Sequence, residues 1–133
     1  MLDLFKKKNK TDQMRILIVD DEADLTSTMQ CRLAANNYDV ITASDGRQGL
    51  EKAQTEKPDI ILLDNNMPVM TGPEMLEQLR NHPELKNIPV IMLTALCEAK
   101  DIASVSAYGI SDYVTKPFDY PALMEKIANA LKT

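Results

Sequence analysis

The sequence predicts an α/β fold in which (βα)₅ units form a doubly wound, five-stranded parallel sheet. Five short apolar runs alternate along the chain with five segments of helical spacing. The apolar runs are nearly continuous, as is typical of parallel strands that are covered on both faces. Such units cross over right-handedly, and polar residues gathered where the runs end favour the strand order 2-1-3-4-5.

The expected elements follow one another with short connections. Strands are predicted at residues 15–19, 39–43, 59–63, 89–93 and 112–115, and helices near 23–36, 46–56, 72–81, 98–108 and 119–132. Two of these helices have clear start signals. Thr71 followed by Glu74 predicts a capping box, and Asp119 predicts an N-cap for the last helix.

Length and charge predict one domain with a short leader. The chain has 133 residues, of which 44% are hydrophobic, enough to bury the core of a single domain. Residues 14–133 carry 11 basic and 18 acidic side chains, a net charge of −7. Residues 1–13 carry four lysines and two aspartates, a net charge of +2, and are expected to form a flexible basic tail. The acidic body argues against direct binding of nucleic acid.

Cysteine content and hydropathy predict a cytoplasmic location. The two cysteines, Cys31 and Cys97, cannot form a disulfide framework and suit a reducing compartment. No apolar stretch approaches the 18 residues of a membrane span, so none is expected. The tail includes three apolar residues beside its lysines, so weak contact with an anionic surface is an alternative to simple disorder.

Three carboxylates are expected to meet at one edge of the sheet. Asp20 and Asp21 follow the first apolar run, and Asp64 follows the third. In the flavodoxin-like order these two strands are neighbours, and ligands bind outside the carboxyl ends of the strands where the order reverses. Three clustered carboxylates repel one another unless a cation lies among them. Oxygen ligands with room for water favour Mg²⁺ over a fully caged Ca²⁺.

Two further polar residues end the fourth and fifth apolar runs and complete the predicted site. Lys116 supplies a positive charge and Thr94 a hydroxyl donor, the groups needed to neutralise and orient a phosphoryl group. A carboxylate can itself be the nucleophile and form an aspartyl phosphate. Each residue also has an ordinary interpretation, as a helix cap, a strand residue or a solvated charge. Their combination favours the functional interpretation.

Four motifs now identify a family resemblance that covers residues 14–133. VDDE at 19–22, LLDNNMP at 62–68, LTA at 93–95 and DYVTKPF at 112–118 resemble the receiver domain of bacterial two-component response regulators. The resemblance implies a signalling domain that accepts a phosphoryl group and assists its own phosphorylation and dephosphorylation, rather than an enzyme. Its partners would be a sensor histidine kinase or a phosphotransfer protein.

The same resemblance assigns roles residue by residue. Asp64 would be the phosphoacceptor, and Asp20, Asp21 and the backbone carbonyl of Asn66 would complete its Mg²⁺ site. Thr94 and Lys116 would contact the phosphoryl oxygens. Tyr113 would be the aromatic switch that turns inward with Thr94, and the Lys116–Pro117 peptide bond would be cis.

The resemblance also implies an output face, formed by the helix near 98–108, the strand at 112–115 and the helix at 119–132. A downstream effector or a second copy of the domain would bind there. In the family that these motifs resemble, the residue two after the threonine flanks the path of the attacking water. Leu96 stands there, and an apolar side chain that excludes this water predicts slow autodephosphorylation. The alternative is that Leu96 only begins the next helix and packs away from the site.

Some positions depart from the commonest pattern, and other functions remain open. Val69 and Thr71 stand where MPGMDG is frequent. A haloacid-dehalogenase phosphatase would need an aspartate where Glu22 stands, and in a flavodoxin the acidic VDDEAD segment would repel the flavin phosphate. Two alternatives keep the fold: an adaptor that works without phosphorylation, and a receiver that belongs to a longer regulator.

Overall fold

The computed structural model describes residues 13–95 and 109–132, and within them the predicted parallel sheet is confirmed. Its strands are β1 (Arg15–Val19), β2 (Asp39–Ala43), β3 (Ile60–Asp64), β4 (Val90–Ala95) and β5 (Asp112–Lys116). All neighbouring pairs are parallel, and the order is β2-β1-β3-β4-β5. β1 and β3 are therefore adjacent, as the placement of the three carboxylates requires.

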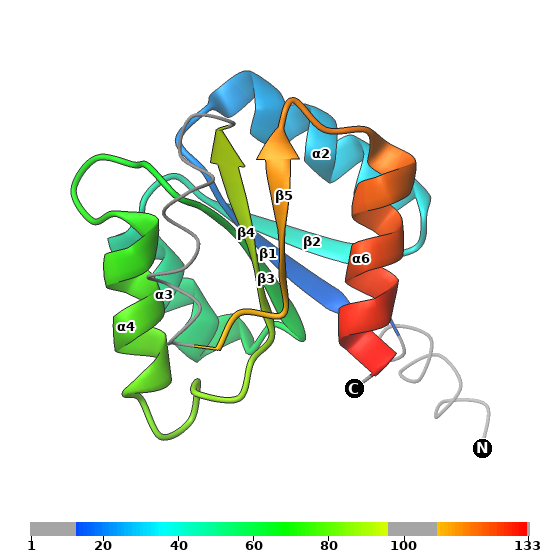
Figure 1. Ribbon diagram of the computed structural model, residues 1–133. Coiled ribbons are helices and arrows are strands. Elements are labelled where there is room, and N and C mark those ends of the chain that lie inside the picture. The colour runs from blue at the N-terminus through cyan, green and yellow to red at the C-terminus, as the bar shows by residue number, and fades with distance from the viewer. Residues whose placement is uncertain (1–12, 96–108, 133) are drawn as a thin grey trace, which may run out of the picture.

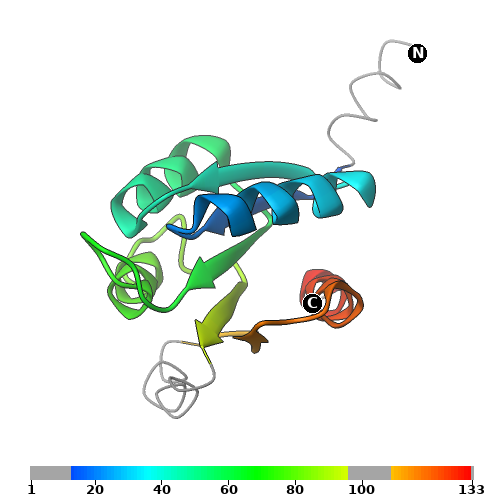
Figure 2. The same cartoon turned by 90° about the horizontal axis from the view of Figure 1, so that it is seen from above.

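Helices cover both faces of the sheet (Figures 1 and 2). The described helices are α2 (Ala23–Ala35), α3 (Gly46–Glu56), α4 (Gly72–Arg80) and α6 (Tyr120–Lys132). α3 and α4 lie on one face, and α2 and α6 lie on the other. The helix predicted near 98–108 falls outside the described residues. In the described part of the chain, no helix is both long and apolar enough to span a membrane.

The core has two layers because successive side chains of a strand point to opposite faces. On β1, Leu17 and Val19 pack with the α3 and α4 side, whereas Ile16 and Ile18 pack with the α2 and α6 side. All four are fully buried. Burying a side chain of this size contributes roughly 1.5–3 kcal/mol relative to exposure. The double burial explains why β1 reads as a continuous apolar run rather than an alternating one.

Three strands end later in the chain than the sequence predicts. β3 includes Asp64, β4 continues to Ala95 and β5 includes Lys116. Ladder pairing continues through these positions, since Asp64 pairs with Leu93 and Ala95 pairs with Lys116. The sequence pattern missed these residues because they are polar or follow polar ones. Asp64, Thr94 and Lys116 are consequently held by the sheet itself, whereas Asp20 and Asp21 directly follow the end of β1.

The remaining boundaries match the prediction or differ from it by one residue. β3 and β4 begin at Ile60 and Val90, one residue later than predicted, and α2 and α4 end one residue earlier. At β4 the reason is Pro89, which has no N–H to donate to the ladder. α6 begins at Tyr120 because Asp119 is its cap, accepting a hydrogen bond of 2.7 Å from the backbone N–H of Ala122. That N-cap was predicted correctly.

The predicted capping box at the start of α4 is confirmed. Thr71 Oγ1 accepts from the Glu74 N–H at 3.2 Å, and the Thr71 N–H donates to Glu74 Oε1 at 2.8 Å. These reciprocal bonds satisfy two of the donors that a helix start leaves unpaired. The next residue, Gly72, lies against the strand end, where an added Cβ would be 2.3 Å from the Asp64 carbonyl oxygen. Only glycine fits there, so α4 starts directly against the backbone of Asp64.

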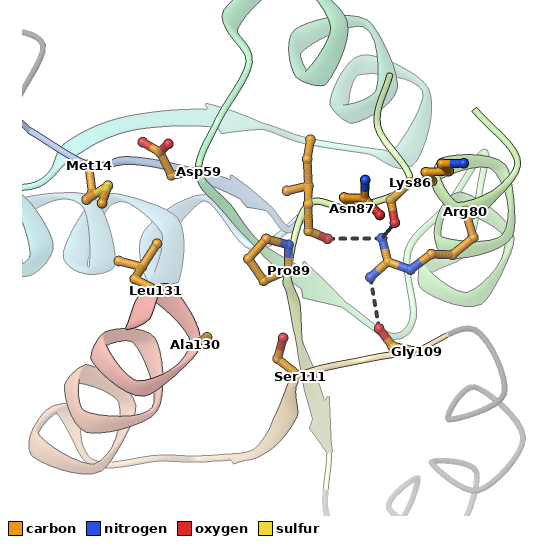
Figure 3. Close-up of a pocket in the computed structure, with 11 residues that line it drawn as sticks. Met14, Asp59, Arg80, Lys86, Asn87, Pro89, Gly109, Ser111, Ala130 and Leu131 are labelled. Carbon is orange, nitrogen blue, oxygen red and sulfur yellow. Dashed lines mark hydrogen bonds between the residues drawn. The ribbon is translucent and has the colours of Figure 1, made fainter. Parts of the chain in front are cut away.

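An open pocket of about 650 Å³ lies at the opposite end of the sheet, at the amino ends of the strands (Figure 3). Arg80, at the end of α4, lines one side of it. Its guanidinium donates to the carbonyls of Lys86 and Ile88 at 3.1 and 3.0 Å, and to the carbonyl of Gly109 at 2.9 Å. Arg80 thus joins the loop before β4 to the chain that enters β5.

Candidate functional site

The structure brings Asp20, Asp21 and Asp64 together at the carboxyl edge of the sheet. One carboxylate oxygen from each lies within 4.8 Å of the others. Asp20 and Asp64 are only 2% and 5% exposed, whereas Asp21 is exposed. The cluster forms because β1 and β3 are paired, with Val19 opposite Leu63 just before the carboxylates. This juxtaposition is the one expected from the strand order.

Burial makes the charge on Asp64 unfavourable. Desolvation, followed by the charge of Asp20, raises the pKa of Asp64 to about 6, although Lys116 and the backbone N–H of Asn66 act in the opposite direction. Bringing a divalent cation among these oxygens would offset the repulsion between them. A set of three carboxylates, one of which is exposed to solvent and able to share its ion with water, fits Mg²⁺.

Lys116 is bound by three carboxylates at the end of β5. Its Nζ donates to Glu22 Oε1 at 2.8 Å, to Asp20 Oδ2 at 2.9 Å and to Asp64 Oδ1 at 3.2 Å. Burial by itself lowers the pKa of this ammonium, but its bonds to Glu22 and Asp20 and the charges of Asp20 and Asp64 outweigh burial and raise it. Lys116 therefore stays charged at any physiological pH.

Glu22 contacts Lys116, and the sequence did not predict this contact. In the sequence, Glu22 argues only against a haloacid-dehalogenase phosphatase, and nothing predicts a role for it at this site. The available signal was a third consecutive acidic residue in VDDE, but adjacency does not show where a long side chain points. In the structure its carboxylate makes the shortest of the three bonds to Lys116.

Thr94 lies at the same edge but does not bond to the carboxylates. It is fully buried near the end of β4, and its Oγ1 donates to the carbonyl of the next residue, Ala95, at 3.2 Å. β4 lies between β3 and β5, with Thr94 paired to Thr115 next to Lys116. The hydroxyl is thus carried on the strand that lies between the strand of Asp64 and the strand of Lys116.

The remaining predicted site residues lie around this cluster. Tyr113 is 42% exposed on β5, so it is not a core aromatic, and the Lys116–Pro117 bond is cis as predicted. Asn66 is exposed, and its backbone N–H bonds to Asp64. The role of the Asn66 carbonyl as a metal ligand stays a prediction. Leu96, on which the predicted phosphoryl lifetime depends, lies outside the described residues.

The loop between β3 and α4 contains a strained residue. Val69 has a φ of +68° and is 76% exposed, and the Met70 N–H donates to the Pro68 carbonyl at 2.6 Å across it. A β-branched residue rarely adopts this left-handed conformation. Val69 is one of the positions where the sequence departs from the common pattern, and in the structure this valine has a left-handed backbone.

Comparison with known proteins decides the family. The family model described as "Response regulator receiver domain" matches residues 16–128. The chain belongs to the response regulator receiver family. The resemblance read from the four motifs is thereby confirmed.

Curated relatives and solved structures of this receiver family agree. The chain is 46% identical over 104 residues to the alkaline phosphatase synthesis transcriptional regulatory protein PhoP of Bacillus subtilis, covering 78% of this chain and 42% of that protein. It is 38% identical over 118 residues to the response regulator ArlR of Staphylococcus saprophyticus, covering 89% and 52%. The receiver domain spans about half the length of these relatives.

Among solved structures, chemotaxis protein CheY4 of Vibrio cholerae has a TM-score of 0.83 at 33% identity, with 89% of this chain and 98% of that chain covered. The receiver domain of Francisella response regulator 1452 has a TM-score of 0.82 at 29% identity, with 90% and 98% covered. The strand order and both helical layers of the receiver fold are therefore those of experimentally determined receivers.

Proposed function

We propose that this receiver domain accepts one phosphoryl group on Asp64 from a histidine kinase or a phosphotransfer protein, with Mg²⁺ as cofactor. The observation that supports this most directly is the placement of Lys116 Nζ 3.2 Å from Asp64 Oδ1, beside the two further carboxylates of the acidic cluster. The arrangement provides a nucleophilic oxygen, a place for a cation and a fixed positive charge at one point.

Each residue of the site has its own role in the phosphoryl transfer. A carboxylate oxygen of Asp64 forms a bond to phosphorus while the bond from phosphorus to the donor's histidine nitrogen breaks, and the electron pair leaves with that nitrogen. The Lys116 ammonium neutralises charge on the phosphoryl oxygens, and the Thr94 hydroxyl donates a hydrogen bond to them. Asp20, Asp21, Asp64 and the carbonyl of Asn66 would hold Mg²⁺, which supplies further neutralisation of that charge.

Intact-mass measurement tests the proposal. With Mg²⁺ and acetyl phosphate, the wild-type domain is expected to gain the mass of one phosphoryl group, and Asp64→Asn is expected to gain none. Asp24→Asn is the matched control, because Asp24 is an exposed aspartate in the first turn of α2. A chelator should abolish the gain. A mass shift that survives in Asp64→Asn would show that the acceptor is another residue.

We also propose that phosphorylation is read out through Thr94 and Tyr113. When the Thr94 hydroxyl turns toward the phosphoryl group, the space it leaves admits the ring of Tyr113, which is exposed without the phosphoryl group. This would reshape β5 and α6 together with the segment at 98–108, where an effector or a second copy would bind. Such a change would distinguish the domain from an adaptor that works without phosphorylation.

NMR spectra with and without beryllofluoride, an analogue of the aspartyl phosphate, test this readout. Amide signals of β5 and α6 are expected to shift together with those around Asp64. Shifts confined to the acidic cluster would contradict the proposed output route while leaving phosphorylation intact.

We also propose that residues 14–133 form the functional unit, after the basic segment at 1–13, and that it works in the cytoplasm. The free thiol of Cys31 suits a reducing compartment. Fractionation and limited proteolysis of the full chain test these two assignments.

A further inference from the structure

Glu22 occupies a helix N-cap without capping the helix. It precedes α2 with an extended backbone, and no hydrogen bond runs from the helix to its side chain. Ser, Thr, Asp and Asn are preferred at such a position because their short side chains reach the first free N–H groups. The Glu22 carboxylate reaches away instead and accepts from Lys116 Nζ at 2.8 Å.

The three acceptors of Lys116 differ in how well water can replace the lysine. An ammonium has three donors, and here they face Asp20, Glu22 and Asp64. The Asp20 side chain is fully buried and that of Asp64 is 7% exposed, whereas the Glu22 side chain is 58% exposed. If Lys116 gave up one partner, Glu22 is the partner whose carboxylate water could reach most readily.

We propose that Glu22 is a positioning residue that holds Lys116 in the unphosphorylated state and releases it when a phosphoryl group occupies Asp64. The inference rests on the proposed function and adds a determinant of how tightly the phosphoryl group is held. A phosphoryl oxygen needs one donor of an ammonium whose three donors are already engaged. The contact given up is the one with Glu22, and this release opposes phosphoryl binding.

The size of the effect follows from the exposure of the pair. Ion pairs with one largely exposed partner are weak, and losing such a pair changes an equilibrium constant by roughly 1.5- to 5-fold. Removing the Glu22 carboxylate should therefore tighten binding of a phosphoryl analogue by about that factor. Glu22 is next to Asp21 in the chain, so removing its negative charge could also change the affinity for Mg²⁺. Metal binding and phosphoryl binding must therefore be measured separately.

Titration with beryllofluoride at saturating Mg²⁺ tests the inference, with amide NMR signals giving the apparent Kd. Glu22→Gln and Glu22→Ala are expected to lower this Kd by about 1.5- to 5-fold, and the Lys116 ammonium signal of the free domain should shift in both variants. Glu77→Gln is the control, because Glu77 is exposed on α4. A separate Mg²⁺ titration without beryllofluoride gives the metal affinity.

The outcomes distinguish this inference from the function it rests on. Tighter beryllofluoride binding in both Glu22 variants, with Glu77→Gln equal to the wild type, supports it. An unchanged or raised Kd in the Glu22 variants, while the wild type binds normally, overturns the inference alone. If the wild type binds no beryllofluoride at saturating Mg²⁺, the proposed function fails, and the inference fails with it.

Discussion

Replacing Asp64 by asparagine should stabilise the metal-free domain, although it removes the proposed phosphoacceptor. The buried carboxylate of Asp64 has a pKa of about 6 in the folded domain against 3.8 for an unperturbed carboxyl. A folded-state pKa above the unfolded value means that ionisation is harder in the folded protein. The contribution of this group is therefore most favourable below the unfolded pKa and is lost as pH rises through the folded pKa.

The magnitude follows from these two values. A difference of about 2 pKa units corresponds to roughly 3 kcal/mol when the group is ionised in both states, as at pH 8. At pH 5 the folded group is mostly protonated, and the penalty falls to roughly 1.5 kcal/mol. The neutral amide of the variant has no such penalty, so the stabilisation by Asp64→Asn should grow between pH 5 and pH 8. The 3.2 Å contact with Lys116 is already included in this magnitude, because it lowers the pKa of Asp64 against the effect of burial.

Urea denaturation of the wild type and Asp64→Asn at pH 5 and pH 8, with a chelator present, measures the difference in unfolding free energy. Mg²⁺ should reverse the order, because it binds the folded wild type more tightly than the variant and stabilises it by linkage. A variant that is less stable than the wild type at pH 8 without metal would refute the reasoning. An advantage that shrinks with rising pH would show that the carboxylate is not destabilised by burial.

Substitutions at three further positions test what holds the fold together, each followed by urea denaturation. Val69→Gly should stabilise by up to about 1 kcal/mol by relieving the left-handed backbone at φ +68°, whereas Val69→Ala should gain little. An equal gain in stability for Val69→Gly and Val69→Ala would contradict relief of the backbone strain as the cause. Gly72→Ala should destabilise the fold by about 1–3 kcal/mol, because the added Cβ would lie 2.3 Å from the Asp64 carbonyl oxygen. The strand end that carries Asp64 must then shift, so Mg²⁺ binding should weaken. An unchanged Mg²⁺ affinity would show that the strand end does not move. Arg80→Lys should destabilise the fold by about 1–2 kcal/mol, since an ammonium cannot span the carbonyls of Ile88 and Gly109. A variant as stable as the wild type would show that these hydrogen bonds of Arg80 do not stabilise the fold.

Much of the site could be predicted because the sheet imposes it. Continuous apolar runs mark strands buried on both faces, and parallel strands end at one edge, so Asp20 and Asp64 had to meet once β1 and β3 were neighbours. The order of strands itself does not follow from hydrophobic patterning alone. It came from the polar residues at the strand ends and from the family motifs, and the structure confirms it.

Other features could not be predicted because they depend on side-chain reach and backbone angles. Nothing in VDDE shows that the carboxylate of Glu22 meets Lys116, which lies 94 residues later in the chain. The positive φ of Val69 is likewise a consequence of how the loop closes before Gly72, not of valine's own preference. Strand ends were placed too early because Asp64 and Lys116 are polar, although each still belongs to the ladder.

Under the proposed function, the charge balance of the site determines the order in which Mg²⁺ and the phosphoryl donor bind. At neutral pH Asp20, Asp21, Glu22 and Asp64 contribute about four negative charges and Lys116 one positive charge, a sum near −3 within one edge of the sheet. A phosphoryl donor is itself an anion, so this edge repels it until a divalent cation has reduced the negative charge. We therefore expect Mg²⁺ to bind before the donor. Glu22 makes that requirement stronger, because it adds negative charge and also occupies a donor of the lysine that the phosphoryl group needs.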